Sequence, residues 1–189
     1  MDALFQVDGN ILLFIQEYIR QDWMTPIWIT ITSLADDGWF WIALSVVLLI
    51  PKKTRKAGAA ALLALLLNLF FTNIILKNMV ARIRPYEVVA GLEILIDPLK
   101  SFSFPSGHTA CSFAAAFAYF RCLKQKKWGI AALVLAGLIG FSRLYVGVHY
   151  PTDVLGGAAV GMFAAWIASG IVGTVSKAFQ KKKQAKNAE

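Results

Sequence analysis

The sequence predicts an all-α, polytopic membrane protein: a six-transmembrane-helix bundle with an N-terminal amphipathic helix. Two observations predict this class. The chain is 58% hydrophobic and 16% charged, whereas soluble domains are about 45–50% apolar and about 25% charged. Its apolar residues form long runs separated by short charged segments, which is the pattern of membrane-spanning helices. We assign residues 1–189 to a single domain.

Residues 1–22 are predicted to lie at the membrane interface. Apolar residues recur there at helical spacing, namely Ile11, Leu12, Ile15 and Ile19. The polar Gln16, Glu17 and Arg20 face elsewhere. This pattern predicts an amphipathic helix over residues 9–22 on the bilayer surface. The alternative is that the segment extends the first span. No basic region precedes an apolar stretch, so we expect no cleavable signal peptide.

Six apolar segments are predicted to be spans, at residues 23–36, 38–50, 57–79, 105–123, 128–147 and 152–175. The first two are shorter than the roughly 20 residues that a span normally needs. We interpret them as a hairpin that is broken at Asp36-Asp37-Gly38.

Basic residues predict the orientation of the bundle. The 51–56 loop, the 121–127 loop and the tail at 176–189, together with Arg20, hold 14 of the 19 basic residues. Cytoplasmic loops carry such an excess, so we expect both termini and this basic tail to be cytoplasmic. The net charge of +8 is spread over separate loops, and we therefore expect no nucleic-acid partner.

Two predicted helix starts indicate an anion-binding site. Pro105 suits the first turn of a helix, where its missing N–H costs nothing. The amides of residues 106–108 then have no intrahelical partner, and the positive end of the helix dipole lies behind them. Pro151 begins the sixth span just after His149, so the two helix starts can aim at one point.

Cations at the outer ends of the spans indicate the same kind of ligand. Lys77 and Arg84 flank the end of the third span, and Arg143 lies at the end of the fifth. A charge at such depth needs a partner, and because few acids are nearby we expect a bound anion, such as phosphate, which arginine recognises with two N–H groups. Arg82 either joins this set or pairs with Glu87 or a lipid headgroup.

An acid–base pair completes the pattern. His149 and Asp153 are four residues apart across a helix start, which allows contact. The carboxylate would fix the tautomer of the ring, and His149 would present its other nitrogen as a nucleophile. His108 would then protonate a leaving oxygen, because histidine titrates near neutral pH.

These residues resemble, in order, the three motifs of the type 2 phosphatidic acid phosphatase (PAP2) superfamily. The motifs are Lys77, six residues and Arg84-Pro85; Pro105-Ser106-Gly107-His108; and Ser142-Arg143, five residues, His149, three residues and Asp153. The match covers residues 77–153 closely. It is specific because all three motifs occur with the correct internal spacing.

The resemblance implies a membrane phosphatase that needs no metal and no cofactor. His149 would become phosphohistidine, Asp153 would orient it, and His108 would protonate the departing oxygen and later help to activate water. The phosphoryl oxygens would be held by Lys77, Arg84, Ser106, Gly107 and Arg143.

The motifs read the phosphate and not the lipid tail, so two lipid phosphate substrates are considered. The first is undecaprenyl diphosphate, hydrolysed to undecaprenyl phosphate and phosphate. The alternative is phosphatidylglycerophosphate or phosphatidate. We expect the site on the extracytoplasmic face of a bacterial cytoplasmic membrane. A lipid or anion transporter without hydrolysis is the candidate from another class, although the His–Asp pair is better explained by chemistry.

The longest outer loop is predicted to act as a lid over the entrance for the lipid. Residues 86–104 mix apolar and acidic side chains, which suits a lid at the lipid interface. The alternative is ordinary packing over the helix ends. The sequence leaves the oligomeric state open.

Overall fold

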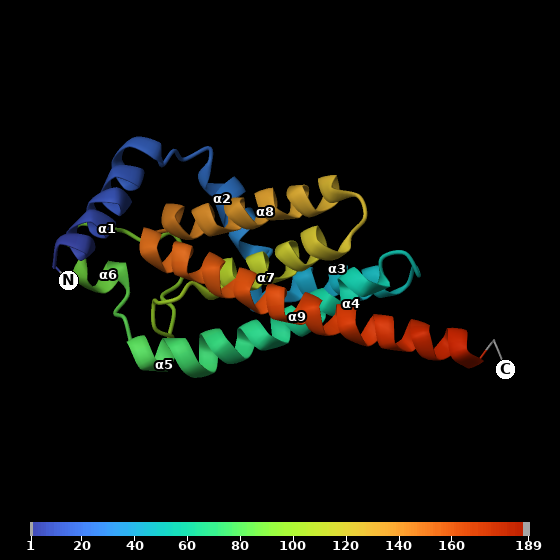
Figure 1. Cartoon of the computed structure of the whole chain (residues 1–189). Helices are drawn as coiled ribbons and strands as arrows, with labels where there is room; N and C mark the ends of the chain where they lie inside the picture. Colours follow the sequence, from blue (N-terminus) through green and yellow to red (C-terminus); the bar gives the residue numbers. More distant parts are fainter. Residues whose placement is uncertain (1, 187–189) are drawn as a thin grey trace.

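The computed structural model describes residues 2–186, and every regular element in that range is a helix. Three long helical stretches run side by side (Figure 1): the one that begins with α4 (Arg55–Leu69), α8 (Lys126–Tyr145) and α9 (Pro151–Lys186). Between them lies α7 (Gly107–Cys122), which packs against α4, α8 and α9. The predicted all-α membrane fold is confirmed.

The first two predicted spans form one bent helix pair. Helix α2 (Thr25–Ser33) is followed by a 3₁₀ turn, η2 (Asp36–Gly38), and by α3 (Trp39–Leu49). The bend between the two helices is only 46°, so the chain continues in one direction. Each helix rises only about 14–17 Å, roughly half of the apolar core of a bilayer. The interpretation as a hairpin is therefore wrong, because α3 does not fold back beside α2.

The third predicted span is one continuous helix of three parts. These are α4, the wider π-helical η3 (Phe70–Leu76) and α5 (Lys77–Val80). Ala81 ends it with a left-handed backbone (φ 48°), a conformation that stops a helix. In the described part of the chain, three helices are long and apolar enough to cross a membrane, or four if α2 and α3 count as one. The predicted count of six is not confirmed.

The N-terminal helix lies across one end of the bundle. Helix α1 (Asp2–Phe14) continues into η1 (Ile15–Ile19) and so begins seven residues earlier than predicted. Of the four apolar residues on the predicted face, Leu12 and Ile15 are buried and Ile11 is exposed. Apolar side chains such as Leu4 and Phe14 point outward instead. Attachment of this helix to a bilayer surface stays a prediction.

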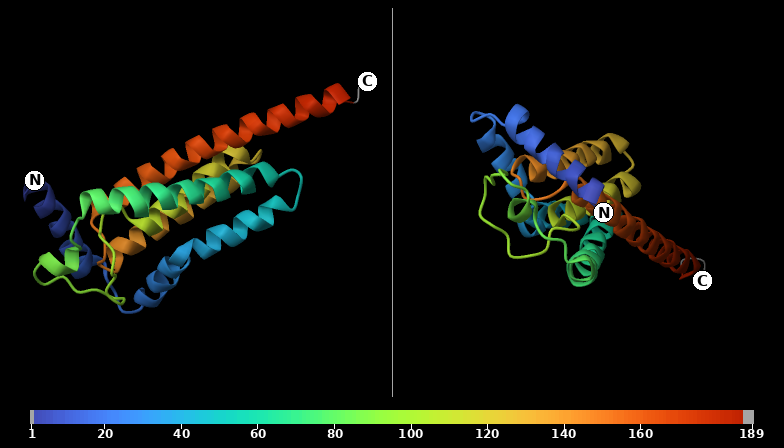
Figure 2. Two further views of the ribbon diagram at one scale, coloured as in Figure 1. Left: turned by 90° about the horizontal axis from the view of Figure 1, so that it is seen from below. Right: turned by 90° about the vertical axis from the view of Figure 1, so that its left-hand side faces the viewer.

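The described ends of the chain lie at opposite ends of the bundle (Figures 1 and 2). The start of α9 lies beside α1, and its lysine-rich end projects at the far side. Arg20 lies at the α1 end, where it donates hydrogen bonds to the carbonyls of Tyr145 (2.7 Å) and Glu93 (2.8 Å). The prediction that both termini and Arg20 share one side does not fit this arrangement, because α3 continues in the direction of α2 and does not return to the same end of the bundle. Residues 187–189 of the predicted tail lie outside the described residues.

The 86–104 loop is pinned to the same end of the bundle. After the short α6 (Pro85–Val88), Gln16 bonds the backbone at residues 91 and 93, and the Leu95 amide donates to Val146 (3.2 Å). Apolar side chains of the loop pack around Tyr145, Val146 and Ile15; they are Ile94, Leu95, Ile96 and Leu99. These contacts agree with the alternative of packing over the helix ends.

Glycines allow α9 to approach α7 closely. A Cβ on Gly161 would lie 2.2 Å from the carbonyl oxygen of Ala110, and one on Gly157 would lie 2.6 Å from that of Ser106. The facing surface of α7 consists largely of buried alanines. Such small residues let helix backbones approach each other in membranes. This contact fixes the start of α7 against the start of α9.

Candidate active site

A cavity of about 550 Å³ opens where the starts of α3 and α7 meet α4 and α5. Five of the eight predicted site residues line it: Lys77, Arg84, Gly107, His108 and His149. The other three, Ser106, Arg143 and Asp153, lie outside its lining and are buried. One side of the cavity is apolar and is formed by side chains of α3 and α4, namely Ile42, Leu62, Leu65, Leu66 and Leu69.

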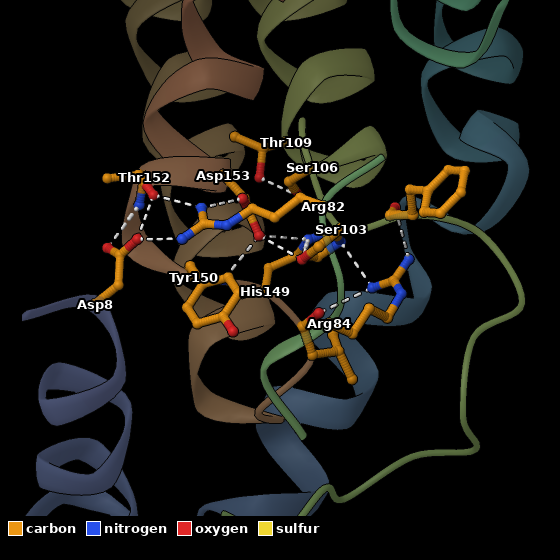
Figure 3. A network of polar contacts seen from close by, with 12 residues as sticks. Asp8, Arg82, Arg84, Ser103, Ser106, Thr109, His149, Tyr150, Thr152 and Asp153 are labelled. Carbon is orange, nitrogen blue, oxygen red and sulfur yellow. Dashed lines mark hydrogen bonds and ion pairs between the residues drawn. The ribbon is translucent and has the colours of Figure 1, made fainter. Parts of the chain in front are cut away.

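His149 and Asp153 face each other across the start of α9 (Figure 3). The distance from His149 Nδ1 to Asp153 Oδ2 is 3.4 Å, and both side chains are almost fully buried. The Tyr150 amide donates to Asp153 Oδ2 (2.9 Å), and so does the Ser103 hydroxyl (2.5 Å). Asp153 is thus held by donors on two sides, which fixes the oxygen that faces the ring.

The contact with Arg84 identifies the nitrogen that is free to react. Arg84 Nη1 lies 3.4 Å from His149 Nε2, and a guanidinium can only donate. Nε2 therefore carries the lone pair and Nδ1 the proton, which points to Asp153. Arg84 itself is held by the carbonyls of Ser101 (2.7 Å) and Val148 (2.8 Å).

Burial keeps the ring of His149 neutral. Desolvation lowers the pKa of His149 from 6.5 to about 3, and the hydrogen bond to Asp153 offsets this only in part. The positive charges of Arg143 and Arg84 lower the pKa further. A neutral imidazole is the nucleophilic form, so His149 is ready to react at any pH near neutrality.

His108 is paired with an acid that sequence reasoning did not place there. Its Nε2 lies 2.8 Å from Asp36 Oδ1. Asp36 belongs to the turn between α2 and α3, and 60% of its side chain is exposed. The break in the first span therefore brings a carboxylate to the second histidine.

Two further cations surround the pair of histidines. Lys77 donates to the Ser101 hydroxyl (3.0 Å). Arg143 is 1% exposed and donates from Nη1 to the Thr32 hydroxyl (2.6 Å). Its Nε and Nη2 have no hydrogen-bond partner among residues 2–186. A buried guanidinium with unused donors is a strong binding group for an oxyanion.

The start of α7 differs from the prediction in two respects. The helix begins at Gly107, not at Pro105, and the Ser106 amide donates to the Asp153 carbonyl (3.0 Å). This amide is not open to an anion, because it joins the starts of α7 and α9. The Ser106 hydroxyl accepts a hydrogen bond from Thr109 (3.0 Å). Of the three amides that we expected to be available to an anion, only those of Gly107 and His108 remain candidates.

Arg82 pairs with neither Glu87 nor the cavity. Its guanidinium lies between Asp153 Oδ1 (2.6 Å) and Asp8 Oδ2 (2.7 Å). The predicted pairing of Arg82 with Glu87 is therefore wrong, because α1 delivers a buried acid to this point.

The residues that sequence reasoning missed are second partners of the motif residues: Asp8, Thr32, Asp36, Ser101 and Ser103. Most of them lie far along the chain from the residues that they bind. Asp8 and Asp36 were detectable as rare acids in apolar surroundings. Ser101 and Ser103 left no pattern. In the described residues, no group of three or more His, Cys, Asp or Glu side chains could hold a metal ion.

Comparison with known proteins decides the family. The model of the PAP2 superfamily matches residues 57–177, a range that contains all three motifs and both histidines. The chain belongs to the PAP2 superfamily. The resemblance inferred from the motifs is thus confirmed.

Relatives in the PAP2 superfamily act on different lipids. The chain is 34% identical to phosphatidylglycerophosphatase B of Bacillus subtilis, over 86% of this chain and 82% of that protein. It is 31% identical to an undecaprenyl-diphosphatase of Sulfolobus acidocaldarius, over 71% of this chain and 64% of the length of that protein. The crystal structure of a transmembrane PAP2-type phosphatidylglycerolphosphate phosphatase from Bacillus subtilis superimposes with a TM-score of 0.75 at 30% identity, over 93% of this chain and 89% of the other.

Proposed function

We propose that this PAP2 member is a metal-independent membrane phosphatase, which hydrolyses a lipid phosphate or diphosphate through a phosphohistidine intermediate. One observation carries the proposal. A single cavity joins two histidines, Lys77 and Arg84 to an apolar wall formed by α3 and α4. The polar part suits a phosphate and the apolar part suits a lipid tail.

In the proposed first step, Nε2 of His149 attacks the phosphorus atom. The bond from phosphorus to the leaving oxygen breaks, and this oxygen keeps the electron pair and takes a proton from His108. The ring of His149 becomes positively charged, and Asp153 stabilises it through Nδ1–H. In the second step, His108 accepts a proton from water as the water attacks phosphorus. The bond from phosphorus to nitrogen then breaks, which releases phosphate and restores His149.

The phosphoryl oxygens are held by cations and by one helix start in this proposal. Lys77, Arg84 and the unpaired N–H groups of Arg143 supply charge, and the Gly107 amide adds a donor at the positive end of α7. Ser106 joins this set only after its hydroxyl turns away from Thr109. Phosphoryl transfer needs chiefly positioning and charge stabilisation, and a group of fixed donors provides both.

The proposed substrate is undecaprenyl diphosphate, and the alternative is phosphatidylglycerophosphate or phosphatidate. The similarity to an undecaprenyl-diphosphatase supports the first. The similarity in sequence and in structure to phosphatidylglycerophosphate phosphatases favours the second. The apolar side of the cavity is formed by aliphatic side chains, which accept either type of tail.

The proposed location is a bacterial cytoplasmic membrane with the site on the extracytoplasmic face. The far end of the bundle carries thirteen of the nineteen basic residues, and such an excess marks the cytoplasmic side. A membrane-impermeant thiol reagent tests this in intact cells, with single cysteines at Val88 or Lys53 in a chain whose Cys111 and Cys122 are replaced by alanine. Labelling at position 88 alone supports the orientation, and labelling at position 53 alone reverses it.

The deciding experiment measures phosphate release by the purified protein in detergent with EDTA present. Undecaprenyl diphosphate, phosphatidylglycerophosphate and phosphatidate are compared by kcat/KM. A preference of about tenfold, or 1.4 kcal/mol in the transition state, assigns the substrate. Loss of activity that only a divalent metal restores would contradict the mechanism.

Variants separate the enzyme from a transporter. His149→Ala and His108→Ala should abolish phosphate release, and Asp153→Asn should reduce it strongly while the protein stays folded. Binding of the lipid should persist in His149→Ala. If His149→Ala releases phosphate at the wild-type rate, or if no lipid phosphate is hydrolysed by the wild type, the proposed function fails.

A further inference from the structure

Arg82 is shared by two buried carboxylates (Figure 3). Its Nη1 lies 2.6 Å from Asp153 Oδ1, and its Nη2 lies 2.7 Å from Asp8 Oδ2. The side chain of Asp8 is 2% exposed, that of Asp153 is 0% exposed and that of Arg82 is 9% exposed. One guanidinium thus connects the acid that faces His149 with an acid on the N-terminal helix α1.

Neighbouring groups fix this arrangement from several directions. Arg82 Nη1 also donates to the Thr152 hydroxyl (2.6 Å), and that hydroxyl donates to Asp8 Oδ2. The guanidinium carbon of Arg82 lies 3.8 Å from the centre of the Tyr150 ring and 4.5 Å from that of Phe5. Because two aromatic rings lie against its plane and both Nη1 and Nη2 donate hydrogen bonds, Arg82 holds one orientation, and so does the carboxylate that it binds.

Arg82 holds the oxygen of Asp153 that does not face the histidine. Oδ1 accepts from Arg82, while Oδ2 accepts from the Tyr150 amide and the Ser103 hydroxyl and faces His149 Nδ1, so the carboxylate is fixed at both oxygens. A chain of three contacts therefore reaches the ring of His149: Asp8 binds Arg82, Arg82 binds Asp153, and Asp153 faces His149.

The charge of the cluster gives Asp8 a second effect. Two carboxylates and one guanidinium carry a net charge of −1, which is available when the ring of His149 becomes positive. Without Asp8, the charge of Arg82 would cancel that of Asp153. Opposite charges at this depth interact strongly because little water screens them. The cavity on the other side of Arg82 is lined by neutral side chains of α1 such as Phe5, Gln6 and Leu13, which do not replace the lost charge.

We propose that Asp8 and Arg82 are positioning residues for the nucleophile. Arg82 orients Asp153, and Asp8 balances the charge of Arg82, so that α1 is part of the catalytic apparatus. This inference rests on the proposed phosphohistidine mechanism, in which positive charge develops on His149.

Arg20 provides a matched control for the N-terminal segment. It ties the same segment to the bundle through the carbonyls of Tyr145 and Glu93. It makes no contact with Arg82 or Asp153 in the described structure. Thr152→Val is a second control, because it removes a hydrogen bond to Asp8 and leaves every charge in place.

The experiment compares kcat, KM and the thermal unfolding midpoint of Asp8→Asn, Arg82→Lys, Thr152→Val and Arg20→Gln, with the purified full chain and the best lipid phosphate. We expect Asp8→Asn to lower kcat about tenfold with KM changed less than about twofold. Arg20→Gln should lower the unfolding midpoint and keep kcat within about twofold. Thr152→Val should lose clearly less kcat than Asp8→Asn.

A double-mutant cycle tests whether Asp8 acts through Arg82. In the background of Arg82→Gln, which has no charge to balance, Asp8→Asn should cause less than about twofold further loss of kcat. Should Arg82→Gln fail to fold, Arg82→Lys replaces it in the cycle. In the Arg82→Lys background the positive charge at position 82 remains, and Asp8→Asn should again lower kcat several-fold.

Two outcomes would overturn the inference. The first is a wild-type kcat in Asp8→Asn. The second is a parallel loss of kcat and unfolding midpoint in Asp8→Asn, Thr152→Val and Arg20→Gln, which would make α1 a structural support only. Both outcomes require a wild type that releases phosphate. The proposed function fails instead if the wild type hydrolyses no lipid phosphate, or if His149→Ala is as active as the wild type, so the two failures are distinguishable.

Discussion

Nε2 of His108, on α7, lies 2.8 Å from Oδ1 of Asp36, which belongs to the turn between α2 and α3. The break thus places an acid opposite the start of α7. A carboxylate oxygen at this distance stabilises positive charge on the ring, which the proposed proton donor must carry before it acts.

Removal of the charge on Asp36 should slow the reaction. We expect Asp36→Asn to lower kcat by about tenfold and to leave KM nearly unchanged, because the contact is to the proton donor and not to the phosphate. The matched control is Asp37→Asn: this neighbour has a left-handed backbone (φ 50°), which asparagine also tolerates. Equal losses in both variants would show that the charge of the turn matters and not the contact with His108.

Two serines in the 86–104 loop should affect different kinetic constants. Ser101 binds Lys77 (3.0 Å) and Arg84 (3.2 Å), so Ser101→Ala should chiefly raise KM. Ser103 binds Asp153 (2.5 Å), so Ser103→Ala should chiefly lower kcat, by about three- to tenfold. Steady-state kinetics of the two variants, each the control of the other, check this. The same pattern in both would contradict the assigned contacts.

Glycine at position 161 should be essential for packing. The Cβ of Gly161→Ala would meet the Ala110 carbonyl at 2.2 Å, so α7 and α9 must separate. Overpacking of this kind destabilises by about 1–3 kcal/mol, and the thermal unfolding midpoint in detergent should fall. Gly170→Ala, on the same helix with nothing within 4 Å, should leave the midpoint unchanged or raised. A lower unfolding midpoint in both variants would show that any substitution in α9 is harmful, and not that the contact between Gly161 and Ala110 is the cause.

The low pKa of His149 should make the protein sensitive to acid. The unfolded chain takes up a proton at His149 below pH 6.5, but the folded protein does not until about pH 3. The unfolded state therefore binds more protons in this window, and stability that is fully present above pH 6.5 is lost as pH falls toward 3. The unfolding midpoint should drop between pH 7 and pH 4.5, and less so in His149→Asn. An equal drop of the midpoint in the wild type and in His149→Asn would show that the acid sensitivity comes from other groups.

The motif residues were predictable because chemistry fixes their identity and spacing. Lys77, Arg84, His108 and His149 do line one cavity, as two opposed helix starts suggested. The bend between α2 and α3 was not predictable from composition, because a break at Asp36-Asp37-Gly38 is compatible with a hairpin or with a bent span. Only packing against the rest of the bundle decides between them.

The error about the N-terminal segment has a similar cause. Charge bias placed Arg20 with the other basic loops, but its partners are backbone carbonyls at Tyr145 and Glu93, and carbonyls leave no pattern in a sequence. The same holds for Asp8, whose partner Arg82 is more than seventy residues away. Local spacing can predict the residues that act on a phosphate, but it cannot predict the long-range contacts that hold them.

The helix that carries Gly107 and His108 is too short to span a bilayer on its own. Helix α7 has 16 residues and a length of about 24 Å, whereas the hydrocarbon layer measures about 30 Å. Its small alanines bury against α4, α8 and α9, so its insertion depends on neighbours made before and after it by the ribosome. A nascent chain that ends before α9 lacks Asp153 and the glycine-lined surface against which α7 packs. His149 therefore meets its acid partner, Asp153, only after the first turn of α9 has been synthesised.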